Sequence, residues 1–193
     1  MVAARTLTEL DWPRRTARLS LRPAVAGDAQ AMYVYRSLPE VSRWMSRQPA
    51  DPAAFAAFMG GHLDVQLVVE LDGEVIGDAM IRVEDAWGQD EVAEHSVRTQ
   101  AELGWCLAPV AWGQGYATEL ATELLAIAFD GLGVRRIHAD CFADNVGSRR
   151  VMEKLGLRRE AHLVAESLHR ELGWLDSLSY ALLADEWRAA GRG

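Results

Sequence analysis

Residues 101–129 read AELGWCLAPVAWGQGYATELATELLAIAF, and this is the most informative stretch of the chain. A strand is predicted over 101–107, and a helix is predicted over 117–129, where apolar residues recur at helical spacing. The turn Trp112-Gly113-Gln114-Gly115-Tyr116-Ala117 joins the two. The stretch therefore places a glycine-containing turn between a strand and the start of a long helix.

This turn has the properties of an anion-binding site. The first N–H groups of a helix have no partner inside the helix, and the helix dipole is positive at that end. Gly113 and Gly115 lack a Cβ, so the backbone can approach a bulky phosphate closely. The sequence therefore predicts that the turn binds phosphate through its backbone N–H groups.

Other nucleotide-binding interpretations of the turn fit less well. A P-loop requires the sequence Gly-Lys-Ser/Thr, and no lysine lies near this turn. A dinucleotide-binding fingerprint matches at Gly113 and Gly115, with Asp140 at the end of the next strand, but Thr118 occupies the third glycine position. On these residues alone, an ordinary glycine-rich turn that caps a helix stays open.

A second motif follows in residues 144–157, which read DNVGSRRVMEKLGL. They predict a helix over 145–155, with Gly156 at the C′ position that favours glycine. Asn145 is a good N-cap residue and Ser148 lies in the first turn, so local capping accounts for both.

The remaining elements complete an α+β pattern. Asp72-Gly73 lies between two apolar runs, which is the strongest short signal of a hairpin, so antiparallel strands are predicted over 66–71 and 74–81. Further strands are predicted over 17–22, 134–142, 157–163 and 176–183, helices over 31–35, 39–45 and 52–59, and a long loop over 84–100. This order predicts a mixed sheet with helices packed on it.

Length and charge limit the class of protein. We expect one domain over 1–193, with 1–16 as a flexible or peripheral segment. The net charge is −8, which argues against a broad nucleic-acid-binding face. No apolar run approaches the roughly 20 residues that span a bilayer, and the N-terminus has no apolar core of a signal peptide. We therefore expect a cytoplasmic protein without nucleic-acid or membrane partners.

The cysteines and histidines predict neither a disulfide framework nor a metal site. Cys106 and Cys141, the two cysteines, lie in apolar segments, which indicates buried thiols in a reducing compartment. No base or electropositive setting is evident beside Cys106, so we interpret it as a buried thiol and not as a nucleophile. The five histidines show no metal-ligand spacing.

Both motifs resemble those of the GNAT superfamily of N-acetyltransferases. The phosphate turn of that family has the form Gln/Arg-x-x-Gly-x-Gly/Ala, which Gly115 and Ala117 match and from which Trp112 departs. Residues 112–120 resemble the branch that includes the acetyltransferases acting on the amino-termini of ribosomal proteins. The resemblance extends from about Arg18 to Trp187.

The resemblance implies a fold and a donor. The fold would be a mixed, mostly antiparallel sheet with a central splayed parallel strand pair and helices on both faces. The donor would be acetyl-CoA, with its thioester in the split between the strands and a backbone N–H near Cys106 or Leu107 facing the carbonyl oxygen. The implied cofactor-binding residues are Cys106, Leu107, Trp112, Gly113, Gln114, Gly115, Tyr116, Ala117, Thr118 and Asn145.

The resemblance also implies catalytic roles. Many family members carry a tyrosine seven residues after the asparagine as general acid, but this chain has Met152 there. The ribosomal-protein branch carries a serine three residues after the asparagine, so Ser148 is implied as the hydrogen-bond donor to the departing thiolate. Glu102, on one strand face with Gly104 and Cys106, is the candidate base for the amine, although a salt-bridged carboxylate is an equal interpretation.

The predicted activity is direct transfer of an acetyl group to a primary amine in a ternary complex. The acceptor is a small-molecule amine or a peptide amino-terminus. An acidic loop would favour a cationic acceptor, although a solvated loop is an equal interpretation; its acids are Glu84, Asp85, Asp90, Glu91 and Glu94. Dimers are common in this branch, so a homodimer is also implied. Met152 motivates the alternative, a non-catalytic acyl-CoA-binding or regulatory module.

Overall fold

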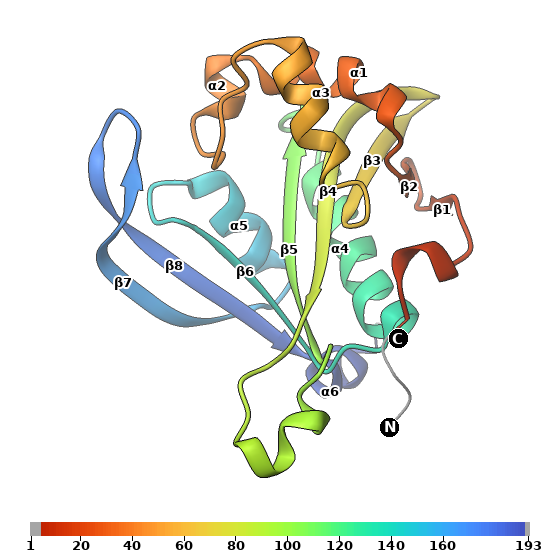
Figure 1. Ribbon diagram of the computed structural model, residues 1–193, viewed down its shortest axis with the longest axis vertical. Coiled ribbons are helices and arrows are strands. Elements are labelled where there is room, and N and C mark those ends of the chain that lie inside the picture. Colours follow the sequence, from red (N-terminus) through yellow and green to blue (C-terminus); the bar gives the residue numbers. More distant parts are fainter. Residues whose placement is uncertain (1–4, 192–193) are drawn as a thin grey trace. The chain divides into compact units, whose positions relative to one another are not determined.

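The computed structural model describes residues 5–191, and its strands form one mixed sheet (Figure 1). The strand order is β1-β2-β3-β4-β5-β6-β8-β7, and β5 (Gln100–Leu107) and β6 (Arg136–Phe142) form a parallel pair. The other strands are β1 (Arg14–Arg15), β2 (Ser20–Pro23), β3 (Gln66–Leu71), β4 (Glu74–Glu84), β7 (Arg158–His169) and β8 (Gly173–Leu183). The predicted fold class, a mostly antiparallel mixed sheet with a parallel pair, is confirmed.

Most of the helices lie where the sequence predicts them. They are α1 (Ala29–Arg36), α2 (Pro39–Ser42), α3 (Pro52–Gly60), α4 (Tyr116–Ala126), α5 (Val146–Lys154) and α6 (Ala184–Ala189). Short 3-10 helices add Leu7–Glu9, Ala26–Asp28, Asp90–His95 and Pro109–Ala111. None of the helices within residues 5–191 combines the length and the apolar character that crossing a membrane requires.

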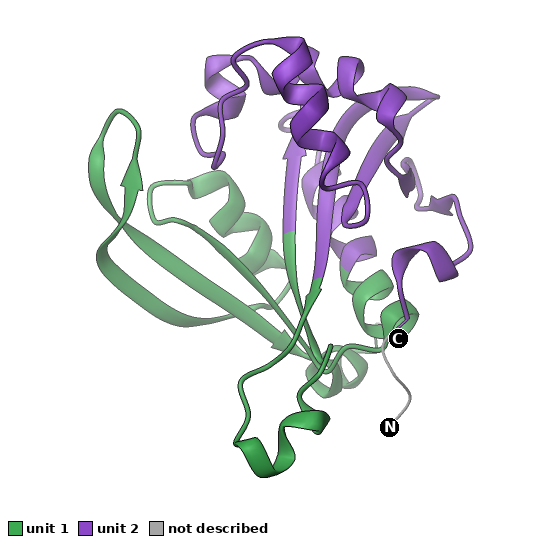
Figure 2. Ribbon diagram, viewed as in Figure 1, with its two compact units in different colours: residues 1–4, 83–103, 125–193 green, residues 5–82, 104–124 purple. Residues whose placement is uncertain are grey.

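The chain forms two compact units, which Figure 2 shows in different colours. Among the described residues, unit 1 contains 83–103 and 125–191, and unit 2 contains 5–82 and 104–124. Each unit has its own buried side chains and its own part of the predicted site.

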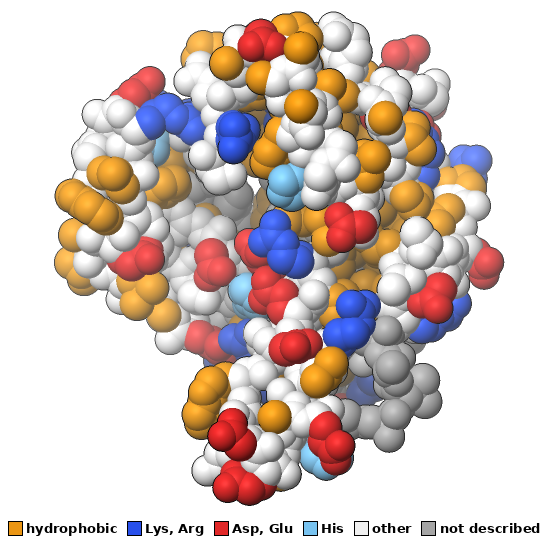
Figure 3. Space-filling model, in the orientation of Figure 1, with side chains coloured by type: hydrophobic (Ala, Val, Ile, Leu, Met, Phe, Trp, Pro, Cys, Tyr) orange, Lys and Arg blue, Asp and Glu red, His pale blue; other side chains and the backbone are white. Residues whose placement is uncertain are grey.

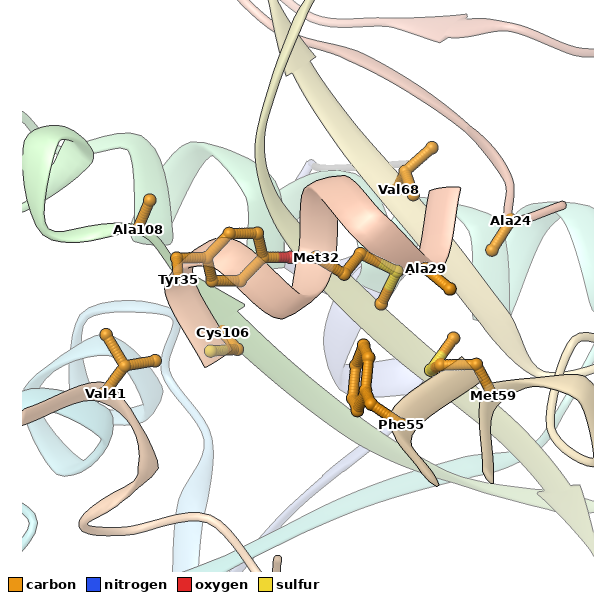
Figure 4. Packing of buried hydrophobic residues seen from close by; sticks show 10 residues of the cluster. All are labelled: Ala24, Ala29, Met32, Tyr35, Val41, Phe55, Met59, Val68, Cys106 and Ala108. Atoms are coloured by element: carbon orange, nitrogen blue, oxygen red, sulfur yellow. The ribbon is translucent and has the colours of Figure 1, made fainter. Parts of the chain in front are cut away.

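Unit 2 has a hydrophobic core between α1, α3 and the sheet (Figure 4). Met32 of α1 is completely buried, and Phe55 and Met59 of α3 are 3% exposed. They cluster with Val68 of β3 and Cys106 of β5. Burying such side chains stabilises a fold by about 1.5–3 kcal/mol each, so this cluster holds the helices against the strands.

A buried polar network also joins α1 to the sheet in unit 2. Asp78 of β4 is fully buried and accepts hydrogen bonds from the Tyr35 hydroxyl at 2.6 Å and from Gln66 Nε2 at 2.7 Å. The Arg36 guanidinium donates to both of its carboxylate oxygens. Burial and the neighbouring Asp78 charge raise the pKa of Tyr35, so its hydroxyl stays protonated as a donor.

The predicted hairpin is confirmed as β3 and β4. Asp72 and Gly73 both have positive φ, 50° and 86°, as a two-residue hairpin turn requires. The segment predicted as peripheral is partly ordered: Arg14 and Arg15 pair with β2, and Arg14 Nε contacts Glu123 Oε1 at 2.9 Å. Residues 1–4 of that segment lie outside the described residues.

Unit 1 is built on the antiparallel strands β6, β8 and β7. The final two strands extend beyond the predicted 157–163 and 176–183, because β7 and β8 continue as a paired hairpin whose side chains are largely exposed on β7. Helix α6 was not predicted; its Trp187 is 2% exposed and donates to Asp130 at 3.2 Å. The helix predicted over 117–129 is α-helical to Ala126 and then continues as a π-helix over Ile127–Leu132.

Candidate functional site

The glycine turn lies in unit 2, and its residues 112–115 are exposed. Gly113 and Gly115 have φ of 75° and 82°, a left-handed conformation that only glycine adopts without strain. Within residues 5–191, the N–H groups of residues 113–117 have no backbone acceptor, whereas those of Thr118 and Glu119 bond to the Gly115 carbonyl. Consecutive N–H groups in such a turn form a concave donor set for an anion.

Two predicted cofactor-binding side chains hold this turn in place. Trp112 Nε1 donates to the Leu107 carbonyl at 2.8 Å, and Gln114 Nε2 donates to the Val110 carbonyl at 2.6 Å. Both bonds point back to the segment at the end of β5. Trp112, which replaces the usual Gln or Arg of the family motif, therefore anchors the turn through its side chain. The donors for an anion are left to the backbone.

Arg18, from the far end of the unit's sequence, also reaches the turn. Its Nη1 donates to the Gln114 carbonyl at 3.0 Å, and its guanidinium lies 4.3 Å from the centre of the Tyr116 ring. Its Nε donates to Glu119 at 2.7 Å. Although burial opposes the shift, hydrogen bonds from Thr16 and Arg18 lower the pKa of Glu119. Arg18 therefore offsets the negative charge of Glu119 in the first turn of α4, next to the glycine turn.

Asn145 and Ser148 are joined by two hydrogen bonds at the start of α5, in unit 1. Asn145 Oδ1 accepts from the Ser148 backbone N–H at 3.1 Å, which is an N-cap, and Asn145 Nδ2 donates to Ser148 Oγ at 3.2 Å. The predicted capping is confirmed. Because the amide occupies a lone pair of Oγ, the hydroxyl proton of Ser148 stays available to another acceptor.

Met152, at the family's tyrosine position, is a core residue. Its side chain is 1% exposed, and its backbone carbonyl accepts from Leu157 at 3.1 Å. A thioether donates no proton, so no general acid is available at this position.

Glu102 lies at the end of the pairing between β5 and β6. The two strands pair in parallel over Gln100–Glu102 and Arg136–His138. Ala101 and Ile137, the middle pair, are fully buried. Side chains alternate along a strand, so Glu102 and its partner His138 share the opposite, partly exposed face.

His138 is a polar residue that the sequence pattern did not single out. Its Nδ1 lies 3.2 Å from Asp140 Oδ2, and its Nε2 lies 3.4 Å from Glu84 Oε2. The hydrogen bond with Asp140 raises the pKa of His138, and Glu84 adds to this rise while partial burial opposes it. His138 and Asp140 share a face because they lie two residues apart on one strand, whereas the contact with Glu84 joins distant parts of the chain that no short stretch of sequence brings together.

The two predicted residues at the end of β5 are buried in unit 2. Cys106 is 6% exposed and Leu107 is 7% exposed. Burial is the main cause that raises the pKa of Cys106 to about 12, with the Asp78 charge adding to it. The thiol is therefore protonated at neutral pH, as expected of a buried cysteine and not of a nucleophile.

The acidic loop divides into one residue that reaches the strands and others that are solvated. Glu84 contacts His138, as described, whereas Asp85, Asp90, Glu91 and Glu94 are exposed. Figure 3 shows acidic side chains gathered over the segment of the 3-10 helix Asp90–His95, at the bottom of the view. Within residues 5–191, no group of three or more His, Cys, Asp or Glu side chains is arranged to hold a metal ion.

Comparison with known proteins gives a consistent result. Residues 18–158 match the family described as Acetyltransferase (GNAT) domain. Over 177 residues the chain is 30% identical to the uncharacterized N-acetyltransferase YnaD of Bacillus subtilis (strain 168), covering 89% of this chain and 97% of YnaD.

Solved structures show the same architecture. A GNAT-family acetyltransferase from Bacillus anthracis superposes with a TM-score of 0.76 at 26% identity, covering 89% of this chain and 98% of that one. Mycobacterium smegmatis RimJ, solved in complex with CoA-disulfide, has a TM-score of 0.71 at 24% identity, covering 90% of each chain. At the latter identity the likeness concerns the fold alone.

Proposed function

Because the chain belongs to the GNAT family of N-acetyltransferases, we propose that it moves an acetyl group from acetyl-CoA to a primary amine. The observation that carries this proposal is the run of N–H groups at residues 113–117, which have no backbone acceptor among the described residues. Such a donor set at the start of an eleven-residue helix suits the pyrophosphate of coenzyme A.

The donor would be held mainly by backbone groups. Gly113, Gly115 and Ala117 would bind the pyrophosphate through N–H groups, while Trp112 and Gln114 keep the turn in shape. The predicted contacts of Cys106 and Leu107 with the pantetheine and thioester would also be made by the backbone, because both side chains are buried.

The chemistry would follow direct attack in a ternary complex. The acceptor amine must be neutral to attack the thioester carbon, and the sulfur must leave as a thiolate that a donor stabilises. Ser148, with its hydroxyl proton available, would donate to that thiolate. Glu102 is the residue that the sequence predicts as the base for the acceptor ammonium. The cytoplasmic location and the homodimer stay predictions from the sequence.

The proposal is tested by a donor titration followed by an acceptor screen. Calorimetry with acetyl-CoA is expected to show one binding site per chain. Release of free thiol is then followed with spermidine, kanamycin, the tripeptide Ala-Ala-Ala and L-lysine, and turnover is expected with at least one of them. Binding of acetyl-CoA without thiol release on all four would contradict transfer to these amine classes.

Arg18→Ala is expected to weaken acetyl-CoA binding about tenfold, which corresponds to a loss of about 1.4 kcal/mol of binding free energy. Loss of Arg18 frees the Gln114 carbonyl and leaves the Glu119 charge uncompensated beside the bound phosphates. Calorimetry with acetyl-CoA and with acetyl-pantetheine, which lacks the pyrophosphate, measures the effect; only the first should lose affinity.

Arg14→Ala is the matched control. Arg14 pairs with Glu123, one helical turn further along α4, in the same way that Arg18 pairs with Glu119. It has no hydrogen bond to the turn within the described residues. Equal losses of acetyl-CoA affinity in both variants would show that Arg18 only anchors the N-terminal segment.

A further inference from the structure

A histidine, His138, lies between two carboxylates at the last paired position of the parallel strands. His138 is the β6 partner of Glu102. Asp140 lies two residues along the same strand and Glu84 comes from the end of β4. The imidazole side chain is 18% exposed, whereas those of Glu84 and Asp140 are 33% and 49% exposed, so an outside molecule reaches the ring past its carboxylate partners.

Asp140 is arranged to orient the ring. Its carboxylate faces Nδ1 at 3.2 Å and also has a hydrogen bond from Ser179 of β8, with which it is in register. A carboxylate at Nδ1 selects the tautomer that carries its proton there. In the neutral ring, the lone pair is then on Nε2.

Nε2 of His138 and the Glu84 carboxylate together form a candidate binding site for an ammonium group. In the neutral tautomer, Nε2 and the Glu84 carboxylate are both acceptors, and they lie 3.4 Å apart. Two adjacent acceptors can both bond to a donor group that lies between them, and a primary ammonium carries three N–H donors. Glu102, on the same face of the sheet as its partner His138, adds a further negative charge.

We propose that His138 takes the proton from the ammonium form of the acceptor, with Asp140 orienting its ring and Glu84 binding the ammonium. This inference rests on the proposed function and makes it more specific: the acceptor binds as a cation. Glu102 then contributes to attracting the cation, and the proton acceptor is the imidazole.

The acceptor ammonium loses two protons in the reaction, and both have a destination. R–NH3⁺ gives one proton to Nε2 of His138 and becomes R–NH2. The amine nitrogen attacks the thioester carbon, the C–N bond forms and the C–S bond breaks. The nitrogen loses a second proton as the amide forms, and this proton is transferred to the sulfur of coenzyme A. His138 then releases its own proton to solvent.

The surroundings of the ring set the expected pH dependence. The charged groups near it are Glu84 of β4, Glu102 of β5, and Asp140 with Arg136 on β6, while its β8 register partner is Ala181. Asp140 and Glu84 raise the pKa of His138 above its ordinary value of 6.5. A base must be deprotonated to act, so kcat/KM should rise with pH, with a midpoint above 6.5.

The test is the pH profile of kcat/KM for whichever of the four panel amines turns over fastest. His138→Gln is expected to lower kcat/KM about 10²-fold on the alkaline side and to remove the acid limb. Asp140→Asn removes the largest cause of the raised pKa, so the midpoint should move to lower pH. Glu84→Gln should raise KM more than it lowers kcat.

His162→Gln is the matched control, because His162 also contacts an aspartate, Asp176, at 2.6 Å but lies on the exposed hairpin. Its profile should equal that of the wild type. NMR titration of the imidazole signals in the free enzyme assigns the midpoint to His138 without activity.

The outcomes separate the two proposals. Normal wild-type turnover with an unchanged profile in His138→Gln would overturn the role of His138 and leave acetyl transfer standing. Absence of thiol release by the wild type with every panel amine would contradict acetyl transfer to these amine classes, and this inference with it.

Discussion

Ser148→Ala is expected to lower kcat about 10²-fold while the affinity for acetyl-CoA stays the same. The hydroxyl accepts from Asn145 Nδ2 at 3.2 Å, so its own proton is directed elsewhere. In the proposed reaction that proton meets charge that develops on the sulfur only as the C–S bond breaks. An interaction made only then changes kcat and not ground-state binding. Thiol release and calorimetry measure the two quantities.

Asn145→Asp makes this prediction sharper. The aspartate keeps an oxygen that accepts from the Ser148 backbone N–H and so preserves the N-cap. It replaces the amide donor with an acceptor, which would draw the Ser148 hydroxyl proton to itself. We therefore expect a loss of kcat with α5 intact by circular dichroism. Full activity of Ser148→Ala across the pH range would reject the role of Ser148.

Asp78→Ala is expected to lower the free energy of unfolding by about 3–5 kcal/mol, the usual cost of removing one partner of a buried ion pair. The substitution leaves the Arg36 guanidinium uncompensated and removes the acceptor of Tyr35 and Gln66. It also leaves a cavity where the fully buried carboxylate stood. Urea denaturation followed by circular dichroism measures the change.

Asp185→Ala is the control for Asp78→Ala. Asp185 also pairs with an arginine, Arg188 at 2.9 Å, but its side chain is 95% exposed. Exposed pairs of this kind contribute about 0.2–1 kcal/mol at most, so little change in unfolding is expected. Similar stabilities for the two variants would mean that the Asp78 network does not hold α1 to the sheet.

Local patterns predicted the elements that depend on neighbouring residues. The Asp72-Gly73 turn, the helix start after Gly115 and the cap at Asn145 were all expected, and the structure has each of them. Turn conformation and capping are settled over three or four residues, so the sequence carries their full signal.

Other elements differ from the prediction because their stability comes from distant contacts. Helix α6 is short and polar in sequence, and it is held by the burial of Trp187 against Phe129 in unit 1. Strand β7 continues beyond the predicted 157–163 to His169; it is mostly exposed there, and its pairing with β8 defines this part of the strand. The π-helix at the end of α4 likewise gave no local signal.

The candidate site also contains parts that local patterns predict and parts that depend on distant contacts. The glycine turn, the Asn145–Ser148 pair and the family could be inferred from the chain's residues alone, because contiguous motifs carry them. The position of Arg18 beside the turn and of His138 between Glu84 and Asp140 appears only in the folded chain. The contacts of Arg18 with the turn and of His138 with Glu84 join residues far apart in the sequence, so no short stretch of sequence specifies them.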